Sequence, residues 1–340
     1  MFALAERSLY ARRLDLWIDS MTSRERCYVS HGHSDHAREH AVVVATPNTA
    51  RICRARFARR AQPKPQLSLL PRVDRKRVEA TFEERAFNQP WEEAGHRLTL
   101  FSAGHVLGSS QLMIEGEDGS YVYTGDFKLA PSLTAEPPEV KRCDVLLMEC
   151  TFGRPQYAFP PREEVAQAMV AFARRALEDG AVPVFFAYSL GKAQEAIAIL
   201  GGAGLKLAVH ASVDTMSQVY LECGISLPPF ARYDAQRVDP GSAFVWPPGA
   251  TLPKELRDRP VRTAVLTGWA MDRGALFRYG TQHGFALSDH ADYPALLQYI
   301  ERAQPRKVYL NHGFRDFVHR LRGLGVDAEY LEENAQLSLF

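Results

Sequence analysis

The stretch SHGHSDHAREH at residues 30–40 gathers four potential metal ligands in one short segment, namely His31, His33, Asp35 and His36. Imidazole and carboxylate groups are suited to Zn²⁺, Mn²⁺ or Fe²⁺. A short apolar run precedes the stretch and predicts a strand, so the four side chains lie in the loop that follows it. Since each buried polar side chain would need a partner, the pattern favours a metal site over a solvated loop.

The spacing within this stretch predicts two metal ions rather than one. His31 and His33 are two residues apart, so they point the same way from an extended segment and can bind the same ion. Asp35 and His36 come where the chain turns and can reach a second ion.

Three other candidate ligands lie at predicted strand ends: His105 in AGHVLGSS, Asp126 in YTGDF and His312 in YLNHG. Each alone is an ordinary loop residue, but together with the cluster they complete two metal shells. We expect the first ion to be bound by His31, His33 and His105, the second by Asp35, His36 and His312, and both to be bridged by Asp126. Two ions about 3.5–4 Å apart can clamp a water and a phosphoryl oxygen.

The pattern along the chain changes after residue 155. Before it, short apolar runs at 14–18, 27–30, 41–45, 97–102, 111–115, 121–124 and 145–148 predict strands. After it, helical periodicity at 162–178, 192–200 and 213–222 alternates with runs at 182–187, 206–210 and 261–267. Further on, 293–302 predicts a helix and 307–310 a strand just before His312. We therefore expect an α/β protein with an insertion between its two ends.

Beyond the ligand set, four segments resemble motifs of a known family. MECTFG at 148–153 resembles the acidic motif A of β-CASP nucleases, SDHAD at 288–292 their histidine motif B, and LNHG at 310–313 their motif C. FAYSLGKAQE at 186–195 resembles a segment of the domain inserted in that branch, with one extra residue and Lys in place of Arg. The chain thus resembles metallo-β-lactamase-fold β-CASP nucleases, and most closely the bacterial ligase-associated DNA exonucleases.

The resemblance implies a fold and an activity. The fold is an αββα sandwich formed by residues 1–160 and 281–340, with a smaller α/β β-CASP domain inserted at 161–280. The activity is that of a DNA exonuclease in DNA repair that uses two divalent ions, Zn or Mn. A DNA ligase and a helicase are the implied partners.

The resemblance also implies roles for residues outside the ligand set. Asp19, in LWIDS, corresponds to the first acidic motif and orients a ligand loop, or it is a simple turn residue. Glu149 fixes the orientation of His290, which faces the scissile phosphate and protonates the leaving oxygen. We assign catalytic roles to Asp35, Glu149 and His290. Phosphodiester cleavage needs such an acid more than ester cleavage does, so this pair favours a nuclease over a thioesterase.

Phosphate contacts are expected from Ser189 and Lys192, which open a predicted helix after a strand, and from Arg273 in GWAMDRG. Within 51–77 a cluster of basic residues could follow a nucleic-acid backbone or form a solvated helix face. Its members are Arg51, Arg54, Arg56, Arg59, Arg60, Lys64, Arg72, Arg75, Lys76 and Arg77.

Three alternatives to a DNA nuclease stay open. The same chemistry could act on RNA, because attack by a metal-activated water does not use the 2′-OH. A hydrolase of small molecules is disfavoured by Glu149 and His290, and an inactive scaffold by the filled ligand positions. We favour DNA over RNA because the chain carries no recognisable RNA-binding module.

Composition limits the cellular setting. The chain has 340 residues, 46% hydrophobic residues and a net charge of +1, which excludes a uniformly basic nucleic-acid coat. Its five cysteines contain no C-x-x-C pair, which fits a reducing compartment. No signal peptide and no apolar run of about 18–20 residues is evident, so we expect a cytoplasmic protein with no membrane contact.

Overall fold

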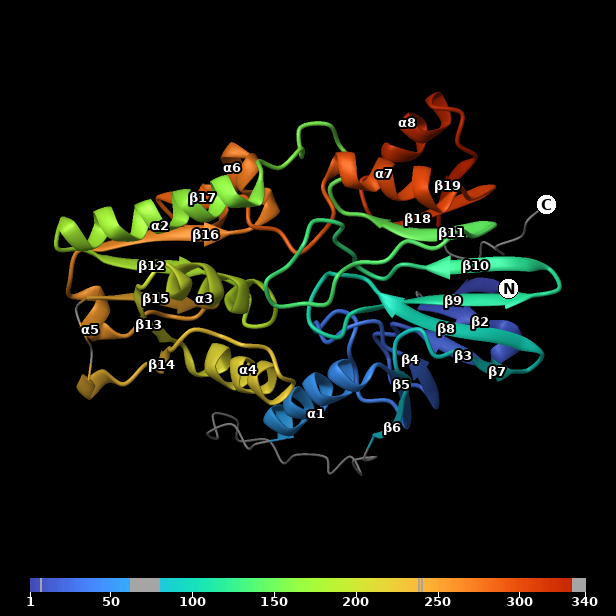
Figure 1. Ribbon diagram of the computed structural model, residues 1–340, viewed down its shortest axis with the longest axis horizontal. Helices are drawn as coiled ribbons and strands as arrows, with labels where there is room; N and C mark the ends of the chain where they lie inside the picture. The colour runs from blue at the N-terminus through green and yellow to red at the C-terminus, as the bar shows by residue number, and fades with distance from the viewer. Residues whose placement is uncertain (7, 62–79, 238, 240, 332–340) are drawn as a thin grey trace, which may run out of the picture.

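Three β-sheets organise the chain, and each draws on its own set of segments (Figure 1). The computed structural model describes residues 1–6, 8–61, 80–237, 239 and 241–331. The first sheet has the order β1 (Phe2–Ala5), β2 (Ser8–Ala11), β3 (Leu16–Ile18), β4 (Arg26–Tyr28), β5 (Val42–Ala45) and β6 (Thr81–Glu84). Its first three strands are antiparallel and the rest are parallel.

The second sheet joins segments from both ends of the sequence. Its order is β19 (Ala328–Tyr330), β18 (Lys307–Gly313), β11 (Val145–Cys150), β10 (Gly119–Tyr123), β9 (Ser110–Gly116), β8 (His96–Ser102) and β7 (Trp91–Glu93). The parallel pairing of β11 with β18 brings motif A and motif C side by side.

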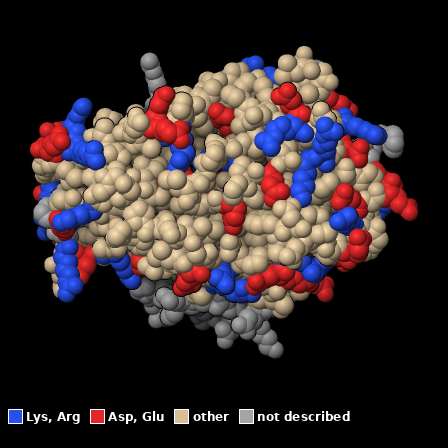
Figure 2. All heavy atoms as spheres, in the orientation of Figure 1, with Lys and Arg blue, Asp and Glu red and all other residues tan. Residues whose placement is uncertain are grey.

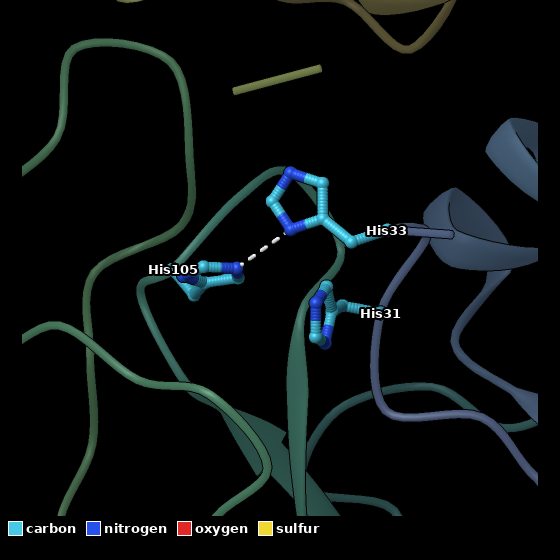
Figure 3. Close-up of side chains that lie close together, drawn as sticks. All are labelled: His31, His33 and His105. Carbon is cyan, nitrogen blue, oxygen red and sulfur yellow. Dashed lines mark hydrogen bonds between the residues drawn. The ribbon is translucent and has the colours of Figure 1, made fainter. Parts of the chain in front are cut away.

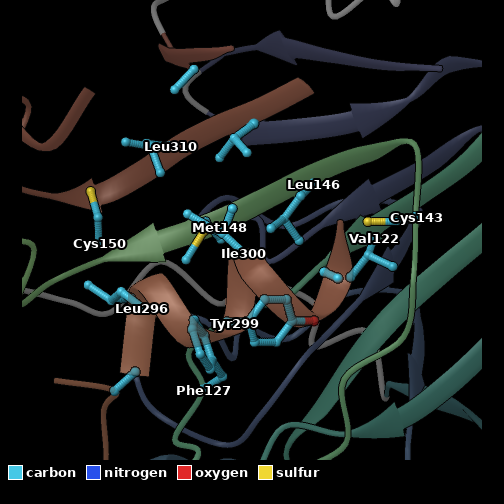
Figure 4. Packing of buried hydrophobic residues seen from close by; sticks show 14 of the residues in the cluster. Val122, Phe127, Cys143, Leu146, Met148, Cys150, Leu296, Tyr299, Ile300 and Leu310 are labelled. Carbon is cyan, nitrogen blue, oxygen red and sulfur yellow. The ribbon is translucent and has the colours of Figure 1, made fainter. Parts of the chain in front are cut away.

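These two sheets pack face to face, with helices outside, as the αββα sandwich requires (Figure 1). The second sheet is covered by α7 (Tyr293–Ala303) and α8 (Phe317–Gly323), and α1 (Pro47–Ala61) packs on the first. The period-2 alternation of a strand explains how β11 serves both layers. Leu146 and Met148 pack toward α7, where they meet Tyr299 (Figure 4). Leu147 instead belongs to the core between the sheets.

The third sheet is wholly parallel and lies beside the sandwich (Figure 1). Its order is β14 (Ala231–Arg232), β13 (Lys206–Val209), β15 (Ser242–Trp246), β12 (Val182–Phe186), β16 (Val261–Leu266) and β17 (His283–Phe285). The helices of this part are α2 (Arg162–Glu178), α3 (Lys192–Gly202), α4 (Ala211–Glu222), α5 (Lys254–Arg257) and α6 (Arg273–Tyr279). Apolar clusters cover both faces of the sheet, as is usual for parallel sheets.

The mixed α/β architecture and most expected elements agree with the sequence analysis. The helix predicted at 162–178 is α2, residue for residue. The strand predicted at 14–18 is shorter, because Leu14 ends the 3₁₀ helix η1 (Arg12–Leu14) and Asp15 has a φ of 46°. β17 belongs to the third sheet although it lies beyond residue 280, and the division of the chain into domains stays a prediction. Within the described ranges, no helix combines the length and apolar character that a membrane span needs.

Candidate metal centre

The candidate ligands lie in loops at one end of the sandwich, on the side of the third sheet. The strands β8 and β10 run toward that side (Figure 1), and the loops that follow them carry His105 and Asp126. The loop after β4 carries the histidine cluster. There the amide N–H of His36 donates to the carbonyl of His33 at 3.2 Å, a turn that folds His36 back toward His31.

His31, His33 and His105 converge on one point (Figure 3). His105 Nδ1 lies 2.6 Å from the backbone carbonyl of Asp289, so it carries the proton and donates. His33 Nε2 likewise faces the carbonyl of Leu190 at 3.2 Å. The other ring nitrogens, His33 Nδ1 and His105 Nε2, are then unprotonated and face each other at 2.9 Å.

His31, His36 and Asp126 form a second convergent group. Asp126 Oδ2 lies 3.6 Å from His31 Nε2 and 3.4 Å from His36 Nε2. It also lies 3.9 Å from His105 Nε2, so the carboxylate stands between the two groups. His312 lies beside this group, with its ring centroid 5.4 Å from that of His36.

Asp19 orients two of these histidines through hydrogen bonds. Its Oδ2 accepts from His36 Nδ1 and from Tyr123 OH, each at 2.8 Å. Ser30 Oγ donates to the same oxygen at 2.6 Å and lies 3.0 Å from His31 Nδ1, from which it can accept. Both rings are thereby turned so that their Nε2 atoms face the Asp126 carboxylate.

The residues present fit a bound cation. Two unprotonated nitrogens at 2.9 Å, His33 Nδ1 and His105 Nε2, repel each other unless a proton or a cation lies between them. His31 Nε2 is buried and has no hydrogen-bond partner. Burial, with neighbouring rings, holds the pKa of His31 well below its usual value, so this ring is in the neutral form that binds metals. Nitrogen ligands of one tetrahedral zinc ion lie about 3.3 Å apart, which is close to the 2.9 Å between His33 Nδ1 and His105 Nε2.

Two predicted ligands lie at the rim of the centre. Asp35 and His312 are exposed and line the same cleft as Asp126, but neither belongs to the convergent groups of the described residues. A third group does form around Asp126, with His105 and His290. The assignment of Asp35 and His312 to a second metal ion stays a prediction.

His290 is held at the centre by Glu149. Its Nδ1 donates to the Glu149 carboxylate at 2.8 Å, which leaves Nε2 facing Asp126 Oδ2 at 3.9 Å. Burial disfavours a charged ring, but the carboxylates of Glu149 and Asp126 outweigh it and raise the pKa of His290 to about 9. Glu149 itself is buried and accepts from the amide N–H of Phe127 at 2.9 Å and from Thr151 Oγ1.

A cleft of about 690 Å³ opens over these side chains. Residues of the sandwich line its floor and residues of the third-sheet part line its roof. The roof is lined by Tyr188, Lys192, Thr267, Gly268 and Trp269. A segment of substrate therefore has room to lie between the two parts of the chain.

Of the three residues expected to contact phosphate, Lys192 lines the cleft, Ser189 does not, and the side chain of Arg273 is not described. Lys192 lines the cleft but is buried and ion-paired with Asp289, so little of its charge remains for a phosphate. Ser189 Oγ is hydrogen-bonded with Ser212 Oγ at 2.7 Å and does not line the cleft. Arg273 begins α6, but its side chain lies outside the described part of the structure.

Asp289 is a residue of the site that the sequence analysis gave no role. Its carboxylate pairs with Lys192 of α3, while its backbone carbonyl accepts a hydrogen bond from His105 Nδ1. It thus connects the third-sheet part to a candidate metal ligand. Its place in SDHAD beside His290 was the only available signal.

The basic cluster at 51–77 is described only in part. Arg54 pairs with Glu84 at 2.7 Å and packs over the Phe82 ring, and Arg51 donates to the backbone carbonyl of Glu222. Neither lines the cleft. The side chains of Arg59 and Arg60, and residues Lys64, Arg72, Arg75, Lys76 and Arg77, lie outside the described part. On the face in Figure 2, Lys and Arg are scattered around the rim and interspersed with Asp and Glu.

Two family models match the segments of the chain that carry the site. Residues 29–197 match the model of the metallo-beta-lactamase superfamily, and residues 282–331 match that of the Zn-dependent metallo-hydrolase RNA specificity domain. Among solved structures, the crystal structure of a protein of unknown function from Enterococcus faecalis V583 has a similar fold. Its TM-score is 0.61 at 15% identity, over 92% of this chain and 80% of that chain.

Three curated relatives are longer proteins than this chain. A probable DNA ligase of Opitutus terrae is 38% identical over 334 residues, which are 97% of this chain and 31% of the relative. A transcription termination factor FttA of a Lokiarchaeum species is 36% identical over 108 residues, 31% of this chain and 17% of the relative. Subunit 3 of the cleavage and polyadenylation specificity factor of Dictyostelium discoideum is 33% identical over 135 residues, which are 39% of this chain and 17% of the relative. The chain thus spans less than a third of the length of these relatives.

Proposed function

Because the chain belongs to the β-CASP branch of the metallo-beta-lactamase superfamily, we propose that it is a metal-dependent nuclease that removes nucleotides from DNA ends. The observation that carries the proposal is the convergence of four histidines, His31, His33, His36 and His105, three of which lie within 3.4–3.9 Å of the Asp126 carboxylate. The cleft opens on this centre, and His290 lines it beside Asp126. The family consists of metal-dependent nucleases, and the reading of this chain as one of them rests on that geometry.

The His and Asp cluster, in this fold, is typical of hydrolases that bind two zinc ions. We assign the first ion to His31, His33 and His105, the second to Asp35, His36 and His312, and the bridging position to Asp126. When bound, two divalent ions supply an activated water and stabilise the charge that develops on the phosphate. The same ligand set accepts Mn²⁺.

The chain's own residues supply the proton for the leaving group. Glu149 holds the Nδ1 proton of His290, so Nε2 of the charged ring carries the proton that faces the cleft. The oxygen that leaves a phosphodiester is an alkoxide, a poor leaving group that this proton would neutralise. A thioester would gain less, since a thiolate leaves readily, and this difference supports phosphodiester cleavage.

The choice of nucleic acid rests on the relatives. The most extensive match of those named above, over 97% of the chain, is to a protein named as a probable DNA ligase, which favours DNA and a place in DNA repair. A ligase and a helicase are the proposed partners, and the cytoplasm the proposed location. RNA is the second candidate, because residues 282–331, which include His290 and His312, match a domain named for RNA specificity.

The test compares matched strands. Purified chain is incubated with single- and double-stranded DNA and RNA of one sequence, each labelled at either end, with Zn²⁺, Mn²⁺ or Mg²⁺. We expect release of short labelled products from a DNA end, and none from samples treated with a chelator.

Two outcomes would change the assignment. Rapid cutting of circular single-stranded DNA would contradict an exonuclease, because a circle offers no end. Faster cleavage of RNA than of the matched DNA would move the function to the second candidate.

A further inference from the structure

The roof of the cleft presents aromatic rings rather than free cations. Tyr188 and Trp269 line the roof, and Tyr188 is 48% exposed. Among the described residues that line the cleft, Lys192 is the one Lys or Arg, and it is ion-paired with Asp289. The described wall is therefore better suited to flat apolar surfaces than to a chain of phosphates.

Trp269 is held in place by neighbouring rings. It belongs to the 3₁₀ helix η3 (Gly268–Met271), and its ring centroid lies 4.8 Å from that of Phe152 and 5.3 Å from that of Tyr157. Phe314 packs at 6.0 Å. The half-buried ring is thus ordered before any ligand arrives, which reduces the entropy lost on binding.

Gly268 makes this arrangement possible. A Cβ atom at residue 268 would lie 2.4 Å from Phe152 Cζ and 2.7 Å from Phe159 Cζ, closer than atoms can approach. Because the residue before Trp269 is a glycine, η3 can pack directly on Phe152 of motif A. The same packing places Trp269 over the cleft.

We propose that Trp269 and Tyr188 bind the unpaired nucleobases of a single-stranded end next to the scissile phosphate. Every base has a π face, so stacking on aromatic rings holds single strands regardless of sequence. In a duplex these faces are already covered by neighbouring base pairs. The inference rests on the proposed nuclease function and adds to it the strandedness of the substrate and the residues that select it.

The experiment measures kcat and KM for a labelled single-stranded oligonucleotide with the full chain and its variants. Trp269→Ala and Tyr188→Ala should each raise KM by about 5-fold to 150-fold, the range for loss of one base stack. Trp269→Phe should recover most of the loss, because it restores a ring. Phe277→Ala is the matched control, since Phe277 is 93% exposed on α6 and does not line the cleft.

An oligonucleotide that lacks bases at its terminal positions separates stacking from a structural effect. With this substrate the KM of the wild-type chain should already be high, and Trp269→Ala should not raise it further. An equal loss on the abasic and the normal strand would overturn the inference. So would an unchanged KM in both alanine variants, a Trp269→Phe variant as weak as Trp269→Ala, or tighter binding of blunt duplex than of single strands.

A binding measurement keeps the two proposals distinguishable. The anisotropy of a fluorescent single-stranded oligonucleotide reports binding without cleavage. If the wild-type chain binds this strand and Trp269→Ala weakens binding while no nucleic acid is cut under any metal, the nuclease proposal fails and the stacking site stands. If cleavage occurs but neither Trp269→Ala nor Tyr188→Ala weakens binding of the oligonucleotide, the stacking proposal fails and the nuclease proposal stands.

Discussion

Asp126→Ala is expected to remove the bound metals and to lower the cleavage rate by about three orders of magnitude or more. Asp126 Oδ2 lies within 3.4–3.9 Å of the Nε2 atoms of His31, His36 and His105, so its carboxylate stands between the two ligand groups. Metal ions contribute several kcal/mol of transition-state stabilisation, and about 1.4 kcal/mol corresponds to tenfold in rate. Metal content by mass spectrometry and the cleavage rate are measured on the same sample.

Two further variants make this result interpretable. Asp126→Asn keeps the shape of the side chain but removes its charge, and we expect it to lose metal as well. Asp327→Asn changes an exposed carboxylate that pairs with Lys307 away from the cleft, and it should keep both metal and activity. Circular dichroism and thermal unfolding check that each variant is folded. Full metal occupancy in Asp126→Ala would remove Asp126 from the bridging position.

His290→Ala is expected to keep the metals yet lose about 10²–10⁴-fold in kcat, the usual contribution of a general acid. His290 Nδ1 is bound to Glu149, and its Nε2 faces the cleft rather than completing the histidine groups of the first loop. Removing it therefore takes away the proton donor and leaves His31, His33 and His36 in place. Single-turnover cleavage and metal content are the two measurements.

The matched control for this variant is His319→Ala, an exposed histidine of α8 that does not line the cleft. It should behave as the wild type in both measurements. If the metals leave when His290 is replaced, His290 is itself a ligand. That outcome would agree with its place in the group with His105 and Asp126, and would exchange the roles proposed for His290 and His312.

Much of the architecture could be predicted because the apolar residues of a helix or strand recur with the period of its buried face. The helix at 162–178 and the strands β8, β9 and β11 show this pattern clearly, and they form as expected. β6 and β7 could not be predicted. Their sequences, TFEE and WEE, contain no apolar run, and each is defined by pairing with a neighbouring strand. Strand formation there depends on tertiary context rather than on local propensity.

The candidate ligands could be named because His31, His33, Asp35 and His36 are close in sequence. The contacts that orient them could not, because they join distant segments. Lys192 shows the difference most clearly. Its position at the start of a helix suggested a phosphate contact, yet its partner in the fold is Asp289, which is far along the sequence. No local pattern records that ion pair, and it leaves stacking on Trp269 and Tyr188 as the better supported means of holding substrate.

The measurement that tests the two-metal nuclease most directly is a titration of metal-free chain with Zn²⁺ or Mn²⁺, followed by cleavage of an end-labelled DNA strand at each step. The account predicts no cleavage by the metal-free chain, and activity that reaches its plateau when about two ions are bound per chain. A plateau at one ion per chain, or cleavage without any added metal, would contradict it.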